Sequence, residues 1–338
     1  IIRDEEGNRV RVPGLFQHCK AVGWYIDGYD RAQISINLTN YKITPPHLVL
    51  DKVRELAHAK GIEVTGSELV GLLPKAALIE SGKYYLAKMG ESTGLPERMV
   101  MDTAIQSMGL AELAPFDLDK KVIEYAIAAK DRLVNLKVTD FIDLLSTDAP
   151  APGGGSVAAL CGAMSGALSA MVANLTVGKK DYEDVQDEVL EIAPLAQDIK
   201  LRALNGIDAD TDAFNELMDA MRLPRKSDEE KQIRDAAIEA ATQHAILMPL
   251  DTMKVSLEAL HMAERIGKVG NANALSDAGV AGLTALAAAK AAYYNIRINM
   301  PGVTDETFKK DTMKKADQIL KECEEIAAKL DKDMMEKL

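Results

Sequence analysis

Two long stretches of small residues limit the possible folds of this chain more than any other feature. Residues 156–177 (SVAALCGAMSGALSAMVANLTV) and 274–296 (ALSDAGVAGLTALAAAKAAYYNI) are rich in Ala, Gly and Ser and carry almost no charge. Small side chains on all sides of a helix allow neighbouring helices to approach closely. We therefore expect both stretches to be buried central helices of a helical bundle or of a subunit interface.

A membrane-spanning helix is the alternative for the first stretch, which is long enough and contains the motif formed by Gly162 and Gly166. Its Leu, Ile, Phe and Val residues are too sparse for strong insertion, and flanking aromatic belts are missing. The second stretch contains Asp277 and Lys290. The buried-helix interpretation is therefore favoured, and we expect no membrane partner.

The first part of the chain has a mixed pattern. Residues 1–12 (IIRDEEGNRVRV) are typical of a hairpin, and residues 20–72 combine strand-like runs such as AQISINL with one helix. Thr44 and two prolines mark the start of this helix, and Gly61 marks its end. Because the chain has no initiator Met and no signal peptide, we expect it to be a piece of a longer protein.

From about residue 74 onward the pattern is helical. Three helices are expected in PKAALIESGKYYLAKMG, in PERMVMDTAIQSMG and, after Pro115, in DLDKKVIEYAIAAKDRLVNL. A second unit begins near KVTDFIDLLS, where Thr139 is placed to cap a short helix, and it continues as long helices. The sequence thus predicts an α+β N-terminal subdomain followed by an all-α helical-bundle domain with buried small-residue central helices.

Charge and cysteine content limit the partners and the compartment. The chain has 40 basic and 52 acidic residues and a net charge of -12, which repels nucleic acid and anionic membranes. Cys19, Cys161 and Cys323 are scattered and form no disulfide framework. We expect a cytoplasmic protein without a nucleic-acid partner.

The glycine run in DAPAPGGGSVAAL, residues 148–160, raises the question of a ligand site. A dinucleotide site needs a strand before the glycines, whereas a short helix and two prolines precede them here. No Lys-Ser/Thr pair follows, so the run is not a Walker loop. Free N–H groups at a helix N-terminus would suit a carboxylate or a phosphate, and a tight turn into a buried helix is the alternative.

Other polar residues are weaker signals. Glu258 and His261 have a spacing used in di-iron bundles, but the second half of such a site is missing, so we expect no metal. Asp210 lies in the acidic cluster IDADTDAFNEL, for which a charge set at a helix N-terminus is the simpler interpretation. In GNANALSDAGVAGL, polar residues open an apolar helix, and polar groups that face a dry interior must be hydrogen-bonded or functional.

These motifs resemble a known family. DAPAPGGGSVAALCGAMSGAL, MVANLTVGKK and GNANALSDAGVA are similar to the cyclodeaminase/cyclohydrolase domain. GWYIDGYDRAQISINLTNYKITPPH, VTGSELVGLLPKAAL and MGLAELAPF are similar to the C-terminal part of glutamate formiminotransferase. In this order they resemble the bifunctional formimidoyltransferase-cyclodeaminase family over essentially the whole chain. The resemblance implies a transferase C-terminal subdomain at residues 1–128, a linker at 129–138 and a cyclodeaminase domain at 139–338.

The resemblance also implies an activity. The family transfers a formimino group from N-formiminoglutamate to tetrahydrofolate, then closes 5-formiminotetrahydrofolate to 5,10-methenyltetrahydrofolate with loss of ammonia, in histidine degradation and one-carbon metabolism. It implies a tetrahydrofolate substrate, possibly polyglutamylated, no tightly bound cofactor, and a homo-oligomer formed through the small-residue helices. The transferase N-terminal subdomain, with its proposed histidine base, has no counterpart in this chain, so we expect transfer only in the full-length protein.

The resemblance gives the polar residues roles. Ring closure needs a base for folate N10 and an acid for the leaving nitrogen, and one carboxylate can serve as both in turn. Asp277 is the first candidate and Asp210 the alternate. The expected substrate-binding residues are Gly153, Gly154, Gly155 and Ser156 for folate carboxylates or the pterin edge, Lys179 and Lys180 for glutamyl carboxylates, Asn271, Asn273 and Ser276 for the pterin or formimino group, and Asn174 without a more specific role.

Two other functions remain open at this point. The same helical domain occurs alone as a methenyltetrahydrofolate cyclohydrolase, in which water replaces the amine chemistry. A non-catalytic folate-binding or assembly module is the third possibility. Ammonia release, methenyl hydrolysis or folate binding without turnover would distinguish the three.

Overall fold

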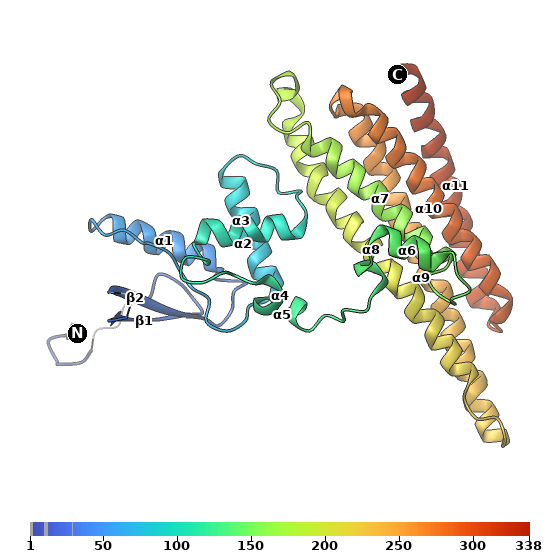
Figure 1. Ribbon diagram of the computed structural model, residues 1–338, viewed down its shortest axis with the longest axis horizontal. Helices are drawn as coiled ribbons and strands as arrows, with labels where there is room; N and C mark the ends of the chain where they lie inside the picture. The colour runs from blue at the N-terminus through green and yellow to red at the C-terminus, as the bar shows by residue number, and fades with distance from the viewer. Residues whose placement is uncertain (1–2, 10–12, 29) are drawn as a thin grey trace. The chain divides into compact units, whose positions relative to one another are not determined.

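The computed structural model describes residues 3–9, 13–28 and 30–338 (Figure 1). The chain forms two compact units. The first comprises Ile1–Gly90 and Glu97–Ala128, and the second comprises Glu91–Pro96 and Ala129–Leu338. Part of the hairpin expected at residues 1–12 lies outside the described residues, and Arg3 and Arg9 form an antiparallel bridge within it.

The first unit is α+β. Strands β1 (Cys19–Ile26) and β2 (Arg31–Leu38) pair antiparallel, with Cys19 opposite Leu38. Its helices are α1 (Pro46–His58), α2 (Lys75–Lys88), α3 (Glu97–Met108), α4 (Leu118–Lys121) and α5 (Ile123–Ala126). Helices α2 and α3 form the core of this unit, in which Leu78, Met101 and Ala104 are fully buried.

The prediction of a single helix after Pro115 was wrong, because the helix is interrupted at Val122. Val122 has an extended backbone (φ -96°, ψ 123°) and is fully buried. The N–H of Leu73 donates to the carbonyl of Lys121 at 3.0 Å, and the N–H of Ile123 donates to the carbonyl of Leu73 at 3.0 Å. This short parallel pairing satisfies backbone groups that a continuous helix would have used.

The second unit is an all-α bundle. It contains the following helices: α6 (Val138–Leu145), α7 (Gly154–Asn174), α8 (Gln186–Met221), α9 (Asp228–Val269), α10 (Leu275–Asn299) and α11 (Glu306–Lys337), with the 3-10 helices η1 (Leu133–Asn135), η2 (Lys180–Val185), η3 (Ala272–Ala274) and η4 (Met300–Gly302). Helix α7 packs against α8, α9 and α10, and α11 packs against α9 and α10 (Figure 1). The predicted fold class is confirmed.

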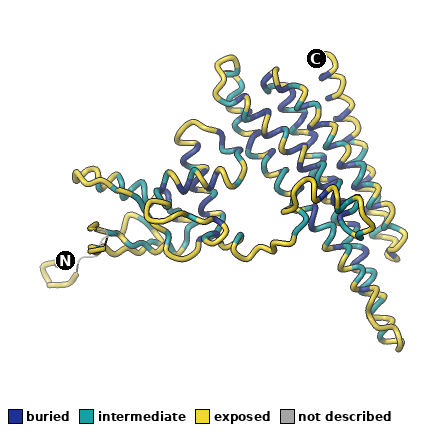
Figure 2. The backbone as a smooth tube through the Cα atoms, viewed as in Figure 1, coloured by how far each residue is buried: buried dark blue, intermediate teal, exposed yellow. Residues whose placement is uncertain are grey.

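Small residues bring the central helices together, as the sequence predicted. A Cβ atom added to Gly166 of α7 would lie 2.7 Å from the backbone nitrogen of Lys200 of α8, so this close approach requires glycine. Helix α7 is long and apolar enough to cross a membrane, but 61% of its most apolar window is buried inside the protein. Figure 2 shows buried residues along the facing sides of α7 to α10.

Two expectations about helix ends differ from the structure. Thr139 does not cap α6, because the helix begins at Val138 and Lys137 is the N-cap residue. The acidic cluster around Asp210 does not lie at a helix N-terminus, because α8 runs without a break from Gln186 to Met221. The cluster therefore needs another explanation.

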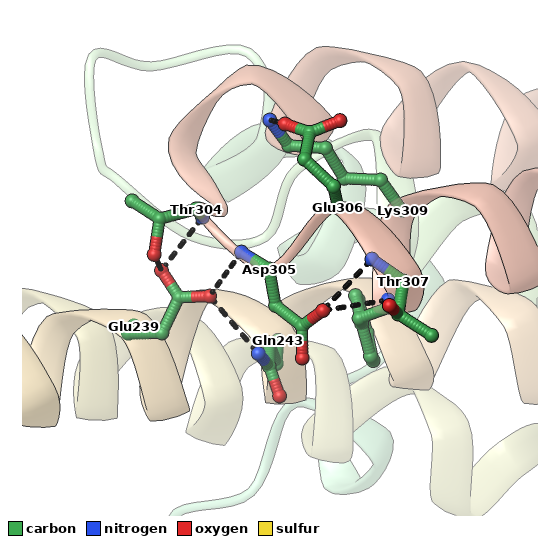
Figure 3. Close-up of polar contacts among 8 residues, drawn as sticks. Glu239, Gln243, Thr304, Asp305, Glu306, Thr307 and Lys309 are labelled. Carbon is green, nitrogen blue, oxygen red and sulfur yellow. Dashed lines mark hydrogen bonds and ion pairs between the residues drawn. The ribbon is translucent and has the colours of Figure 1, made fainter.

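The start of α11 is capped by a side chain from α9 (Figure 3). The carboxylate of Glu239 accepts hydrogen bonds from the N–H and hydroxyl of Thr304 at 2.8 and 2.9 Å, and from the N–H of Asp305 at 3.2 Å. Gln243 donates to the same carboxylate at 3.0 Å. Asp305 in turn is the N-cap of α11 and accepts from the N–H groups of Thr307 and Phe308.

Candidate functional site

The N-terminus of α7 holds a carboxylate of the protein itself. Gly153 is the N-cap residue, and α7 begins at Gly154. The carboxylate of Asp210, from α8, accepts hydrogen bonds from the backbone N–H of Ser156 and from its hydroxyl at 3.4 Å. A helix N-terminus favours a negative charge, and here Asp210 occupies that position.

Glycine is required where α7 meets Asp210. A Cβ atom on Gly155 would lie 1.9 Å from Oδ1 of Asp210, so any side chain here would force the Asp210 carboxylate to move. A Cβ atom on Gly154 would lie 3.3 Å from the amide nitrogen of Asn295 of α10. The glycine run therefore allows α8 and α10 to bring polar side chains against the first turn of α7.

Burial raises the pKa of the Asp210 carboxyl above its ordinary value of 3.8, and the hydrogen bonds from Ser156 offset part of this effect. The single hydroxyl proton of Ser156 is shared between Asp210 and the carbonyl of Ile207, which is the nearer acceptor at 3.0 Å, and this hydroxyl lies 3.4 Å from the hydroxyl of Thr211. A half-buried carboxyl with a raised pKa is suited to exchange protons, and such groups are common at functional sites.

The neighbouring acidic residues of the cluster have structural contacts. Asp208 accepts hydrogen bonds from the N–H groups of Leu133 at 2.8 Å and Val134 at 3.3 Å. Asp212 forms an ion pair with Arg132 at 2.7 Å. Both therefore hold the segment before α6 against α8, which leaves Asp210 as the carboxylate of the cluster without a basic partner among the described residues.

Asn271 lies at the other end of α7 and joins two loops. Its backbone N–H donates to the hydroxyl of Thr176 at 2.9 Å, and its side-chain amide donates to the carbonyl of Leu175 at 3.3 Å. Asn271 is buried. These contacts fix the start of α10 to the end of α7 and give Asn271 a structural role.

Asp277 lies in the first turn of α10 and is half-buried, and Ser276 and Asn273 beside it are exposed. Within the described part of the chain, the side chain of Asp277 forms no hydrogen bond or ion pair. Its carboxylate is thus available, but it is not held in one position as Asp210 is.

Lys179 and Lys180 follow the end of α7 and are exposed, and their ammonium groups contact no acidic partner among residues 3–9, 13–28 and 30–338. Asn174, in the last turn, donates its amide to the carbonyl of Gly94 at 2.8 Å. Its side-chain oxygen is buried and has no hydrogen-bond partner in the described residues.

The predicted site residues therefore form two groups. Gly153, Gly154, Gly155, Ser156 and Asp210 lie at the N-terminal end of α7, and the other predicted residues lie at its C-terminal end. Helix α7 has 21 residues and is about 30 Å long at 1.5 Å per residue. One chain does not bring the two groups together around one reaction centre.

The described residues hold no cluster of three His, Cys, Asp or Glu side chains that could bind a metal ion. Glu258 pairs with Arg202 of α8, and His261 lies 3.7 Å from Glu322 of α11. The two members of the suspected metal pair thus have different partners.

Sequence reasoning missed two polar residues beside the first turn of α7, Thr211 and Asn295. Thr211 follows Asp210 directly, and its hydroxyl lies near Ser156. Asn295 comes from the end of α10 and was hidden inside an apolar stretch. The sequence does contain a signal for Asn295, because it is a single amide side chain near the end of a small-residue helix. Polar residues were singled out only at the start of that helix.

The first unit has a separate pocket of about 740 Å³ that the sequence did not indicate. At its wall, Asp51 accepts hydrogen bonds from Lys88 at 2.7 Å, Tyr84 at 2.9 Å and Tyr85 at 3.0 Å. Burial tends to raise the pKa of the Asp51 carboxyl, but these three donors outweigh it and lower the pKa. Each of these polar groups has a hydrogen-bond partner within the cluster, so the cluster stabilises the packing of α1 on α2.

Together, these features define a class of protein: an α+β unit followed by a helical bundle whose small-residue central helix begins at a half-buried carboxylate. Comparison with known proteins identifies the family. The family model described as Formiminotransferase-cyclodeaminase matches residues 137–318, and the Formiminotransferase domain model matches residues 2–128. The chain belongs to the formiminotransferase-cyclodeaminase family, and the resemblance seen in the sequence is confirmed.

Three relatives show how the match is distributed. Formimidoyltransferase-cyclodeaminase of Dictyostelium discoideum is 34% identical over 330 residues, which cover 96% of this chain and 60% of the relative. Methenyltetrahydrofolate cyclohydrolase of Methylorubrum extorquens is 39% identical over 189 residues, which cover 56% of this chain and 90% of the relative. The crystal structure of formiminotetrahydrofolate cyclodeaminase from Thermotoga maritima has 30% identity and a TM-score of 0.54, and covers 59% of this chain and 96% of that structure. The chain thus spans about 60% of the length of the bifunctional relative.

Proposed function

We propose that this chain is a formiminotetrahydrofolate cyclodeaminase that converts 5-formiminotetrahydrofolate to 5,10-methenyltetrahydrofolate and ammonia. Folate N10 attacks the formimino carbon on N5 and forms a tetrahedral centre. The amine nitrogen gains a proton and leaves as ammonia. A carboxyl group that takes the N10 proton and donates a proton to the amine would accelerate both steps.

One observation carries this proposal: the Asp210 carboxylate at the N-terminus of α7. It is half-buried, its pKa is raised by burial, and Ser156 orients it through two hydrogen bonds. Asp277 remains the second candidate, since it is half-buried and unpaired in the described part of the chain. The geometry favours Asp210, because a proton-transfer group must be held in place.

The remaining predicted residues are proposed as substrate-binding groups. The first turn of α7, from Gly153 to Ser156, would contact the pterin edge beside Asp210. Lys179 and Lys180 would hold glutamyl carboxylates as point charges. We propose tetrahydrofolate, possibly polyglutamylated, as the substrate, and no tightly bound cofactor.

The test is to measure ammonia and methenyltetrahydrofolate formed from 5-formiminotetrahydrofolate by the purified chain. Equal amounts of both products are expected. Absence of ammonia release at saturating substrate would contradict the proposal.

A second function is supported by one relative. The methenyltetrahydrofolate cyclohydrolase of Methylorubrum extorquens is 39% identical to this chain over 189 residues. The same carboxylate would then activate water for attack on the methenyl carbon. Hydrolysis of 5,10-methenyltetrahydrofolate without ammonia release from the formimino compound would favour this activity.

The function of the first unit, the cellular compartment and the oligomeric state are also proposals. Because residues 2–128 match the Formiminotransferase domain model, we infer that they belong to a glutamate formimidoyltransferase that acts when the full-length protein is present. The three free cysteines and the net charge of -12 support a cytoplasmic enzyme, and the family supports a place in histidine degradation. We propose a homo-oligomer formed through the small-residue helices α7 and α10.

A further inference from the structure

Asn295 of α10 is held in one orientation beside the first turn of α7. Its amide nitrogen donates to the carbonyl of Ala291, one turn back in the same helix, at 2.8 Å. A carbonyl oxygen only accepts hydrogen bonds, so the nitrogen of the amide must face it, and this fixes the side on which Oδ1 lies. No donor among residues 3–9, 13–28 and 30–338 binds this oxygen. Oδ1 of Asn295 is therefore an oriented acceptor whose lone pairs are available to a ligand.

The surroundings of Asn295 show that the amide group needs space at the first turn of α7. Asn is a poorer helix former than Ala, and its neighbours in α10, Ala292 and Ile296, are fully buried apolar residues. Asn295 itself is half-buried and faces Gly154. A Cβ atom on Gly154 would lie 3.3 Å from the amide nitrogen of Asn295 and 3.6 Å from its oxygen. Glycine at this position therefore leaves room for the amide.

Asp210 and Asn295 flank the same turn of α7 from two sides. Gly154 faces Asn295 of α10, and Gly155 faces Asp210 of α8. Consecutive residues of a helix point about 100° apart around its axis, and their Cα atoms are about 3.8 Å apart. The two acceptors thus lie on different sides of one short stretch of backbone, so one small group placed at this turn can contact both.

A pair of acceptors selects a group that carries N–H donors. The formimino nitrogen of 5-formiminotetrahydrofolate has one N–H, and it has two when it is protonated. After N10 attacks the formimino carbon, the tetrahedral centre carries an NH2 group, which also has two N–H donors. The carboxylate of Asp210 and Oδ1 of Asn295 can accept one each. A formyl oxygen in the same place has no hydrogen to donate and would meet an acceptor on both sides.

We propose that Asn295 is a substrate-binding residue of the cyclodeaminase site, and that its Oδ1 accepts a hydrogen bond from the formimino nitrogen that leaves as ammonia. This inference rests on the proposed function. From the protonated formimino group, Asp210 takes the N10 proton on attack and returns it to the NH2 group. The bond between carbon and this nitrogen then breaks, ammonia leaves with the electron pair, and the methenyl cation remains. Asn295 exchanges no proton and holds the departing nitrogen beside Asp210.

Asn295→Leu tests this role, because Leu is close to Asn in size but has no acceptor. We expect kcat/KM for 5-formiminotetrahydrofolate to fall at least about 10-fold, since a hydrogen bond to a charged group is lost. The inhibition constant of 5-formyltetrahydrofolate, which has oxygen in place of the formimino nitrogen, should not rise. The ratio of the two quantities is the readout, because a purely structural defect weakens both ligands alike. An equal weakening of both ligands, or no change in either, would overturn the proposal.

A second variant and a matched control complete the experiment. Asn295→Ala adds no bulk beside Gly154 and favours the helix, so it should fold and give the same change in the ratio. Asn299→Leu is the control, since Asn299 lies one turn further along α10 and its amide donates to the carbonyl of Ala245 of α9 at 3.5 Å. The control should leave the ratio unchanged. A change in the control equal to that of Asn295→Leu would overturn the assignment.

Failure of the proposed function would give a different result from failure of this inference. If the wild-type protein neither releases ammonia nor hydrolyses methenyltetrahydrofolate, the proposed function fails. Calorimetry with the wild-type protein then measures the dissociation constants of the formimino and formyl compounds directly. Tighter binding of the formimino compound, lost in Asn295→Leu, would support the role of Asn295 in a folate site without turnover. Equal binding of the two compounds by the wild-type protein would overturn that role.

Discussion

At the scale of single residues, the position of Asp210 determines which chemistry its carboxyl can perform and explains why position 155 of α7 is a glycine. Its carboxylate occupies the N-terminus of α7, where a Cβ atom on Gly155 would touch it. Burial raises its pKa, so the ionised form is less favourable in the folded protein than in the unfolded chain. A group that weakens folding at neutral pH is retained only where the charge has a use.

Asp210→Asn should abolish most activity and stabilise the protein at neutral pH. The raised pKa contributes stability that is present below the ordinary value of 3.8 and is lost as the pH rises through the folded pKa. Asn cannot ionise, so the substitution removes this loss of stability; Tm at pH 7 should rise relative to the wild type, and the difference should shrink in acid.

The cyclisation rate of Asp210→Asn should fall by about 10²- to 10⁴-fold. Asp212→Asn is the matched control, since Asp212 only pairs with Arg132. Normal activity in Asp210→Asn would move the proton chemistry to Asp277.

Gly155→Ala should destabilise the protein, whereas Gly153→Ala should not. The added methyl group at Gly155 would lie 1.9 Å from Asp210, while nothing lies within 4 Å of one at Gly153. Overpacking of this kind costs typically ~1–3 kcal/mol. Urea unfolding of both variants measures the difference. Equal stability of the two proteins would show that Asp210 can move away from α7 without cost.

The sequence indicated the members of this site but not their pairing. The glycine run suggested a bound anion, and the structure places Asp210, which is 54 residues away, against that run. No local pattern shows that a residue in the middle of α8 faces the start of α7, because helix register is set by tertiary packing. Asp277 was ranked first because polar residues open its helix, and sequence spacing could not show that the length of α7 separates it from the glycines.

At the scale of helices, the helix ends that the sequence did not predict are fixed by residues that lie far away in the sequence. Thr139 was expected to cap α6 from within the local sequence, but η1 just before α6 is held instead by Asp208 of α8. The helix expected after Pro115 breaks because Val122 pairs with Leu73. The long helices were predictable from their apolar patterns, since those depend on local spacing.

Glu239→Ala should weaken the docking of α11 on α9. Burial alone would raise the pKa of Glu239, but hydrogen bonds from Thr304, Gln243 and Asp305 outweigh it and lower the pKa (Figure 3). The ionised form therefore contributes stability above the ordinary pKa of 4.5, and this contribution is lost as the pH falls through the lower folded pKa. We expect a loss of about 1 kcal/mol at pH 7, as for other helix caps, and a smaller loss in acid.

The control for this change is Glu325→Ala on α11, which removes a carboxylate from an exposed pair with Lys321 at 3.8 Å. Such surface pairs contribute little to stability. Chemical denaturation at pH 7 and in acid measures both variants. A loss for Glu239→Ala that does not change with pH would show that the carboxylate charge is unimportant to the cap.

At the scale of the whole molecule, the two units differ in how much apolar surface they bury. Of the largest side chains that are almost fully buried, the second unit holds Ile192, Ile246, Met253, Leu260, Ile266, Ile296, Val172 and Val189, and the first unit holds Leu78, Met101, Val100 and Val122. The first unit includes a sheet of two strands, which is marginal in isolation, and Val22, Tyr25 and Ile34 on it are exposed. The sequence predicted the two fold types, but exposure of this sheet depends on which elements surround it in space.

The first unit should therefore unfold before the second. Trp24, the single tryptophan of the sequence, lies in β1, so tryptophan fluorescence reports on the first unit alone. Most helical residues lie in the second unit, so circular dichroism at 222 nm reports chiefly on the bundle. In a urea titration, the fluorescence midpoint should come at a lower concentration than the dichroism midpoint, because less apolar surface stabilises the unit that holds Trp24. Non-coincident transitions are the signature of units that unfold separately, and coincident curves from the two probes would show instead that the chain unfolds as one cooperative body.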